Sequence, residues 1–186
     1  MTMKLYGGAR TRASIVHWYL EELGVTDYEF VMLDMQAGEH LQEPFTAINP
    51  FGKVPAIATD DGYRLWESGA ILLYVDEKYG PTKSAEERAI AAQWVIFANA
   101  TLGPGVFVEA SREKQFPRLM APLNALLEGQ DYIAGDGFTV ADVAVGSMLF
   151  YIPFMLKIEF TDYPAIAAYL QRIMARPAFV KAILNR

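Results

Sequence analysis

Two adjacent residues, Glu67 and Ser68, have side chains suited to binding both charges of an amino acid. A helix is predicted to begin at Ser68, and the free amides of a first helical turn attract an anionic group. The hydroxyl of Ser68 and these amides can therefore receive a carboxylate, while the carboxylate of Glu67 can bind an ammonium group. The ordinary alternative is a serine that caps a helix beside an exposed glutamate.

A second pattern, Val54-Pro55, favours peptide binding. We expect Val54 at the edge of a strand with its amide and carbonyl exposed. There both groups can pair with an extended peptide, as an added strand would. Pro55 can also be an ordinary edge-strand proline with no ligand.

Hydroxyl and guanidinium groups gather where the first predicted strand ends and the first predicted helix begins. The residues concerned are Tyr6, Arg10, Thr11 and Arg12. Positive charge, hydroxyl donors and the outward amides of a helix start together stabilise an anion. The alternatives are that Tyr6 packs in the strand, that Thr11 only caps the helix and that the arginines bind water or acidic neighbours.

The elements that must position these residues mix strands and helices up to Gly80. Strands are predicted at residues 4–6, 27–33, 54–59 and 63–66, and the last two form a hairpin around Asp60-Asp61-Gly62. One helix is predicted from about Arg12 to Gly24, which suits a left-handed C-terminal cap. A second helix begins at Ser68, with its apolar stripe opposite Asp76 and Lys78.

After Pro81 the chain is predicted to be almost wholly helical. Ser84 and Glu87 form a capping box, and Thr139 and Asp142 form another. We expect the first of these helices to reach Leu102 and to be broken by Gly103-Pro104-Gly105. Further helices are predicted at 106–128, 139–157 and 163–175, with a last turn after Pro177. With Gly80-Pro81-Thr82 as the linker, the predicted domains are residues 1–80 and 84–186.

Composition excludes several classes of protein. The chain of 186 residues has no cysteine, which excludes disulfides, thiolate metal sites and a cysteine nucleophile. A net charge of −6 gives no basic surface for nucleic acid or an anionic membrane. We expect a cytoplasmic protein with no metal site.

Three motifs, in this order and at this spacing, resemble the cytosolic glutathione transferases. They are Asn49-Pro50-Phe51-Gly52-Lys53-Val54-Pro55-Ala56-Ile57, Trp66-Glu67-Ser68-Gly69-Ala70-Ile71 and Phe138-Thr139-Val140-Ala141-Asp142. The resemblance covers nearly the whole chain, and the short second half and the opening residues are most similar to a bacterial, cyanobacterial chi-type member. It implies a thioredoxin-like α/β domain followed by an all-helical domain, in a homodimer.

The resemblance also implies that the motif residues bind glutathione as a co-substrate, with no permanently bound cofactor. Val54 and Pro55, the latter after a cis bond, would hold its cysteinyl backbone, and Glu67 and Ser68 its γ-glutamyl group. Lys53 and His40 are candidates for its glycyl carboxylate.

The family lowers the pKa of the glutathione thiol, ordinarily about 8.5, with a residue of the first strand or helix start. Here we favour Thr11 as donor to the sulfur, with positive field from Arg10 or Arg12. Alignment on the strand instead gives this role to Tyr6.

The pocket for the second substrate is expected between the loop at the first helix of the chain and the first helix of the helical domain. Trp94, Phe97, Thr101 and Phe107 are the candidates, although aromatic residues at helical spacing more often belong to a core. Phe51 can insert into a partner subunit, as in some family dimers, or anchor its own loop.

The sequence therefore predicts a glutathione transferase that conjugates glutathione to hydrophobic electrophiles in detoxification. A glutathione-dependent peroxidase or reductase is an alternative, in which two glutathione molecules supply the electrons. A non-catalytic dimeric interaction module is another. The sequence does not identify the electrophile.

Overall fold

The computed structural model describes residues 2–81, 83–135 and 137–185. It divides into a sheet unit, Met1–Thr82 with Pro177–Arg186, and a helical unit, Lys83–Arg176. The sequence-based division differs from this one in its last ten residues, which group with the sheet unit. Thr82, at the end of the predicted linker, lies outside the described residues.

Four strands form the sheet in the order β2-β1-β3-β4. Strand β1 pairs in parallel with β2 and antiparallel with β3, which pairs antiparallel with β4. The strands are β1 (Met3–Gly7), β2 (Tyr28–Met32), β3 (Ala56–Thr59) and β4 (Arg64–Trp66). With a helix between β1 and β2 and another after β4, this is the expected thioredoxin-like arrangement.

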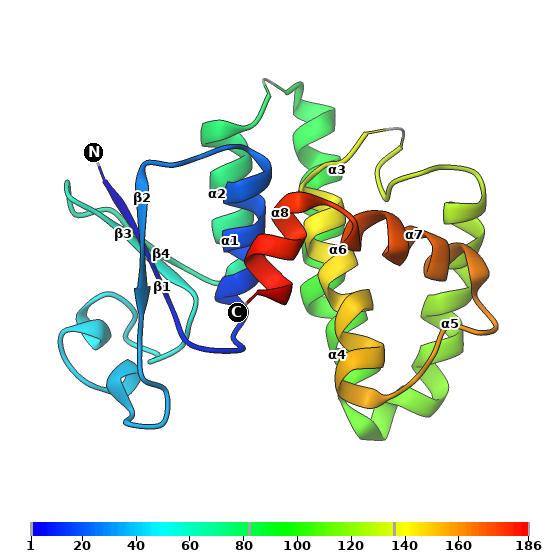
Figure 1. The fold of residues 1–186 in the computed structure, drawn as a ribbon, viewed down its shortest axis with the longest axis horizontal. Helices are drawn as coiled ribbons and strands as arrows, with labels where there is room; N and C mark the ends of the chain where they lie inside the picture. Colours follow the sequence, from blue (N-terminus) through cyan, green and yellow to red (C-terminus); the bar gives the residue numbers. More distant parts are fainter. Residues whose placement is uncertain (1, 82, 136, 186) are drawn as a thin grey trace. The chain divides into compact units, whose positions relative to one another are not determined.

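Helices α1 (Ala13–Glu22) and α2 (Ser68–Tyr79) lie side by side against one face of the sheet (Figure 1). Strand β1 alternates, so Met3, Leu5 and Gly7 are buried. A Cβ atom at Gly7 would lie 2.3 Å from Cβ of Ala13. Only glycine therefore lets the end of β1 approach the start of α1 this closely.

The prediction that Asp76 lies opposite the apolar stripe of α2 was wrong. Asp76 is buried, and the hydroxyl of Tyr19 on α1 donates to its Oδ1 at 2.5 Å. Because a buried carboxylate needs such donors, this contact makes an acidic residue part of the packing between α1 and α2.

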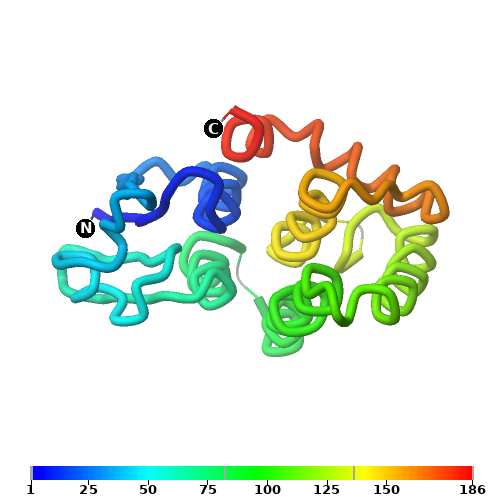
Figure 2. The backbone as a smooth tube through the Cα atoms, turned by 90° about the horizontal axis from the view of Figure 1, so that it is seen from below, coloured from blue at the N-terminus to red at the C-terminus, as the bar shows by residue number. Residues whose placement is uncertain are grey.

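The C-terminal segment packs on α1. It consists of α8 (Pro177–Phe179) and a π-helical turn, Val180–Leu184, which lie beside α1 (Figure 2). The buried rings of Phe179 and Trp18 meet edge to face with centroids 4.9 Å apart. Nearby, Nζ of Lys181 donates to Oε2 of Glu21 at 2.7 Å.

These contacts shift the pKa of Glu21. Burial alone would raise it, but hydrogen bonds from Lys181 and His17 more than offset this, so the pKa lies below its ordinary value. The carboxylate of Glu21 thus stays ionised where it holds the C-terminal segment.

The helical unit follows the predicted order. Its elements are α3 (Ala85–Ile96), a π-helical segment (Phe97–Leu102), α4 (Gly103–Phe107), α5 (Glu109–Glu128), α6 (Val140–Tyr151) with a π-helical turn (Ile152–Leu156), and α7 (Pro164–Met174). Both predicted capping boxes are present, at Ser84 with Glu87 and at Thr139 with Asp142.

The predicted break at residues 103–105 was wrong, because α4 continues the helical path to Phe107. Pro104 stands in the first turn of α4, where a missing N–H is tolerated. Gly105 allows close packing on α5, since a Cβ atom there would lie 2.6 Å from Cδ1 of Leu119. The stretch Ala85–Phe107 is long and apolar enough to cross a membrane, which is weak evidence of spanning because core helices pass the same test.

Asp142 is fully buried at the start of α6. Its Oδ1 accepts hydrogen bonds from the amide of Ile133 at 2.8 Å and the hydroxyl of Tyr169 at 3.1 Å, and its Oδ2 accepts from the amide of Thr139 at 2.8 Å. Burial raises the pKa of Asp142 above its ordinary value despite these donors. The residue thus joins α6, α7 and the loop before them.

Candidate functional site

A polar hollow of about 290 Å³ in the sheet unit brings together most of the predicted ligand-binding residues. They are Arg12, Asn49, Lys53, Val54, Pro55, Glu67 and Ser68. Two cations and one carboxylate line it, so it suits a ligand that carries charges of both signs. Its volume lies near the lower end of typical ligand pockets, about 300–1,000 Å³.

Val54 and Pro55 form one wall just before β3. The peptide bond between them is cis, as expected. Within the described residues, the amide and carbonyl of Val54 make no backbone hydrogen bond. They are available to pair with an extended peptide, which is the geometry required for strand addition.

Glu67 and Ser68 also line the hollow, at the start of α2. Ser68 is the first residue of the helix and is 5% exposed. Glu67 has φ 71° and ψ 120°, a conformation that L residues rarely adopt. Such strain typically occurs at functional sites, where the surrounding structure holds it in place.

Asn49 was missed as a site residue by the sequence analysis. It is 1% exposed, its Nδ2 donates to the carbonyl of Lys53 at 2.7 Å, and its Oδ1 accepts from the amide of Phe51 at 3.1 Å. Asn49 thereby shapes the loop that presents Lys53. An asparagine that bonds to the amide two residues later is a known turn signal.

His40 does not line this hollow. It lies in a 3-10 turn, Glu39–Leu41. If Gly52 carried a Cβ atom, that atom would lie 3.0 Å from the backbone carbonyl oxygen of His40. Gly52 has φ +60°. Glycine is favoured there because it adopts this left-handed backbone conformation readily and because there is no space for a Cβ atom. The turn of His40 thus packs on the loop before Lys53.

Of the residues at the end of β1 and in the loop before α1 that are predicted to stabilise the thiolate, only Arg12 lines the polar hollow. The hydroxyl of Thr11 donates to the carbonyl of Gly8 at 2.9 Å and accepts from the amide of Gly8 at 3.2 Å. Arg12 lines the polar hollow, whereas Arg10 lines a different one. Tyr6 packs against Phe45, with ring centroids 5.7 Å apart, and does not line the polar hollow.

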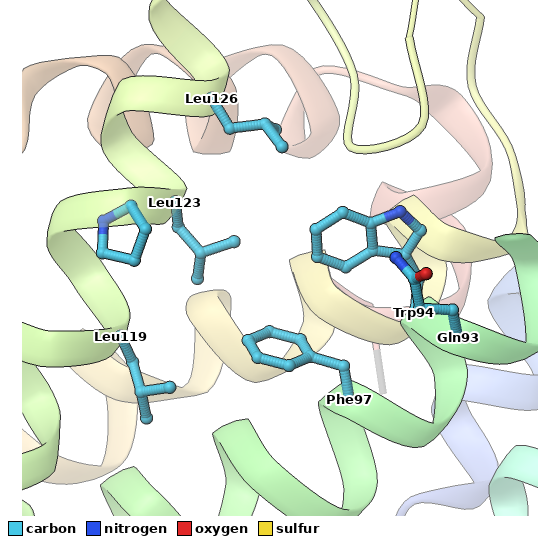
Figure 3. A pocket seen from close by; sticks show the side chains of 7 residues that line it. Gln93, Trp94, Phe97, Leu119, Leu123 and Leu126 are labelled. Carbon is cyan, nitrogen blue, oxygen red and sulfur yellow. The ribbon is translucent and has the colours of Figure 1, made fainter.

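Two of the four predicted residues of the electrophile pocket line an apolar groove in the helical unit. Trp94 and Phe97 on the α3 side face Leu119, Leu123 and Leu126 of α5 across about 260 Å³ (Figure 3). Thr101 and Phe107 do not line this groove. Within the described residues, no group of His, Asp and Glu side chains is arranged to hold a metal ion.

Comparison with known proteins agrees with this geometry. Residues 1–77 match the family model "Glutathione S-transferase, N-terminal domain", and residues 105–177 match "Glutathione S-transferase, C-terminal domain". The chain belongs to the glutathione S-transferase family. It is therefore an enzyme, a glutathione transferase.

Relatives of this transferase include two curated proteins. It is 30% identical to a glutathione S-transferase of Hyoscyamus muticus, over 98% of both chains. It is 32% identical to the disulfide-bond oxidoreductase YfcG of Escherichia coli, over 90% of this chain and 87% of that protein. Among solved structures, a sphingomonad glutathione S-transferase complexed with glutathione has a TM-score of 0.84, with 29% identity over 98% of both chains.

Proposed function

We propose that this transferase binds glutathione in the polar hollow, ionises its thiol and adds the sulfur to hydrophobic electrophiles. The observation that carries the proposal is that two features line the same hollow. One is the backbone of Val54, which has no strand partner, and the other is the pair Glu67 and Ser68, which can bind an ammonium and a carboxylate. The γ-glutamyl group has an ammonium and a carboxylate, and the cysteinyl backbone is extended. Each part of glutathione thus has a matching group.

In this proposal the enzyme supplies no nucleophile of its own, because it has no cysteine. Thiolate formation is favoured by positive charge at Arg12 or Arg10, by the amides at the start of α1 and by a hydroxyl donor. Thr11 remains the proposed donor, although its hydroxyl donates to the carbonyl of Gly8 in this structure. Lys53 is proposed for the glycyl carboxylate, with His40 as a second candidate.

Conjugation of glutathione to a chromogenic aryl halide and to an isothiocyanate tests the proposal. We expect turnover of at least one, and a loss of glutathione affinity in Glu67→Ala. Asp61→Ala, which removes a carboxylate from the hairpin turn between β3 and β4, is the control. Bound glutathione without turnover of either electrophile would refute conjugation as the activity.

A second candidate, glutathione-dependent reduction of a disulfide or peroxide, is supported by the similarity to the E. coli oxidoreductase. Two glutathione molecules can reduce a peroxide to an alcohol and water while forming one glutathione disulfide, without a protein thiol. A rate of organic hydroperoxide consumption higher than the rate of aryl halide conjugation would favour this candidate.

We further propose a homodimer that works in the cytoplasm in detoxification. Phe51 is 67% exposed, so its ring is accessible for insertion into a second copy. Sedimentation of Phe51→Ser alongside the unaltered chain tests this contact, since a dimer held by Phe51 dissociates in the variant. The bacterial chi-type subclass rests on the short helical unit, the absence of cysteine and the opening residues.

A further inference from the structure

The side chain of Met35 packs on the loop at which the thiolate of glutathione is proposed to form. A Cβ atom at Gly8 would lie 2.3 Å from Cγ and 2.7 Å from Sδ of Met35. Met35 thus occupies the space that any side chain at the buried Gly8 would need. Because Gly8 follows β1 and Met35 follows β2, this contact joins the two loops that leave the neighbouring strands.

The backbone of Gly8 in turn holds the hydroxyl of Thr11. The amide of Gly8 donates to Oγ1 of Thr11 at 3.2 Å, and its carbonyl accepts from the same hydroxyl at 2.9 Å. Oγ1 also accepts from the amide of Ala13, the first residue of α1, at 3.4 Å. Two backbone amides therefore orient the lone pairs of this hydroxyl, so a shift of Gly8 moves the proton that Thr11 has to donate.

The loop that carries Met35 is held by hydrogen bonds on both sides of this residue. Oδ1 of Asp34 accepts from the amides two and three residues later, each at 2.9 Å. Oε2 of Glu39 accepts from the amide of Asp34 at 2.8 Å. Before the loop, the amide of Leu33 donates to the carbonyl of Gly7 at 2.7 Å. Because the flanking backbone is fixed, the position of the Met35 side chain is constrained as well.

We propose that Met35 is a positioning residue for thiolate formation, which acts through Gly8 on the hydroxyl of Thr11. The inference rests on the proposed function, because it assigns a support to the proposed donor. Removal of the thioether leaves space beside Gly8, into which its backbone relaxes and carries the amide away from Oγ1 of Thr11. Met35 does not line the polar hollow, so it affects ionisation of the thiol and leaves the binding of glutathione itself unchanged.

The ultraviolet absorbance of the thiolate of bound glutathione, recorded against pH, tests the inference. Met35 also lines a hollow of about 690 Å³ together with Arg10 and Met32, so the measurement is made without an electrophile that could bind there. On the acid side of the titration, Met35→Ala should lower the thiolate fraction about three- to tenfold, as weakening of one hydrogen bond would. The affinity for S-methylglutathione, which has no thiol proton, should be unchanged, and its binding also shows that the variant is folded.

Further variants assign the effect to the contact with Gly8. Met35→Leu keeps a side chain of similar volume and should restore most of the thiolate. Gly8→Ala should lower the thiolate fraction because its Cβ meets Met35, and Met35→Ala added to Gly8→Ala should recover part of it by removing the clashing atoms. Met35→Val, which shortens the side chain less severely, replaces Met35→Ala if that variant does not fold. Met174→Ala is the matched control, since this methionine of α7 is 36% exposed and lies in the helical unit.

A double-mutant cycle shows whether Met35 acts through Thr11. In the Thr11→Ala background, Met35→Ala should cause no further loss of thiolate, because the hydroxyl that it positions is absent. Additive losses from the two substitutions would overturn the inference. A thiolate fraction in Met35→Ala equal to that of the unaltered chain would do the same.

The outcomes separate this inference from the proposed function. If the unaltered chain forms the thiolate and conjugates glutathione but Met35→Ala changes neither, only the inference fails. A thiolate that survives in Thr11→Ala also overturns the inference, while conjugation by the enzyme stands. If the unaltered chain binds glutathione without ionising its thiol, the proposed function fails and the inference fails with it.

Discussion

The side chain of Thr11 forms two hydrogen bonds with the backbone of Gly8, one to its carbonyl and one from its amide. This bridge closes the loop between β1 and α1 on itself and fixes the backbone that carries Arg10 and Arg12. The hydroxyl has one proton, which in this state is donated to Gly8. Donation to a thiolate therefore requires rotation of the hydroxyl, with the bond from the amide of Gly8 retained.

Replacement of Thr11 separates its two roles. Thr11→Ala should lower the free energy of unfolding by about 1 kcal/mol, the usual worth of such hydrogen bonds. It should also raise the apparent thiol pKa of bound glutathione, moving the rise of activity to higher pH with little change in glutathione affinity. Thr11→Ser should preserve both properties. An unchanged pH profile in Thr11→Ala would transfer the proposed role to Tyr6 or an arginine.

Glu67 is expected to lower the free energy of unfolding through its backbone while its carboxylate favours glutathione binding. Its φ of 71° suits glycine, so Glu67→Gly should raise the free energy of unfolding by about 1 kcal/mol and weaken glutathione binding. Glu67→Ala loses the same carboxylate but keeps the strained backbone, so it should weaken binding without the gain in stability. Denaturant unfolding and calorimetry measure the two effects. Equal stability of the two variants would mean that the backbone is not strained at this residue.

The contact between Lys181 and Glu21 predicts a dependence on pH. Because the pKa of Glu21 is lowered in the folded protein, its contribution is present above the ordinary value of 4.5 and is lost as the pH falls through the folded value. Lys181→Met should thus cost about 0.2–1 kcal/mol at neutral pH, as exposed pairs do. Unfolding followed from neutral to acid pH should show this difference disappearing on acidification. If the difference in the free energy of unfolding persists in acid, the effect of Lys181→Met arises from packing rather than from the ion pair.

Asp142→Asn is expected to destabilise the helical unit. Both oxygens of the carboxylate accept hydrogen bonds from backbone amides. In asparagine an NH₂ group replaces one of these oxygens, so one backbone amide would face another donor. A loss of about 1–3 kcal/mol should result. Because burial raises the folded pKa of Asp142, the unaltered protein loses stability as the pH rises from 3.8 through the folded value, and the variant lacks this fall. Thermal unfolding across acid pH measures both effects.

Local signals were sufficient for much of the fold and of the polar hollow. Turn chemistry at Gly62, capping at Ser84 and the spacing of Val54 from Glu67 each depend on a few neighbouring residues. Features that depend on distant partners were not predictable in this way. The burial of Asp76 requires Tyr19, 57 residues earlier, and periodicity assigns a lone acidic residue to the solvent face.

The same limit applies to the two hollows. Arg10 and Arg12 looked alike in the sequence because both follow the first strand. The left-handed backbone of Arg10 directs it to a different hollow, and this conformation is rare for arginine, so no sequence rule predicts it. Met32 lies in the predicted strand at residues 27–33, and nothing in the sequence indicates that it would line a cavity.

The docking of Phe179 on Trp18 has a consequence for synthesis of the chain. The sheet unit is discontinuous, so its strands and α1 leave the ribosome well before the segment that covers Trp18. At roughly 5–20 residues per second, the intervening helical unit delays that cover by several seconds. During this interval an indole that is fully buried in the folded enzyme faces water or a chaperone, and α1 gains its final support only after the whole helical unit has been synthesised.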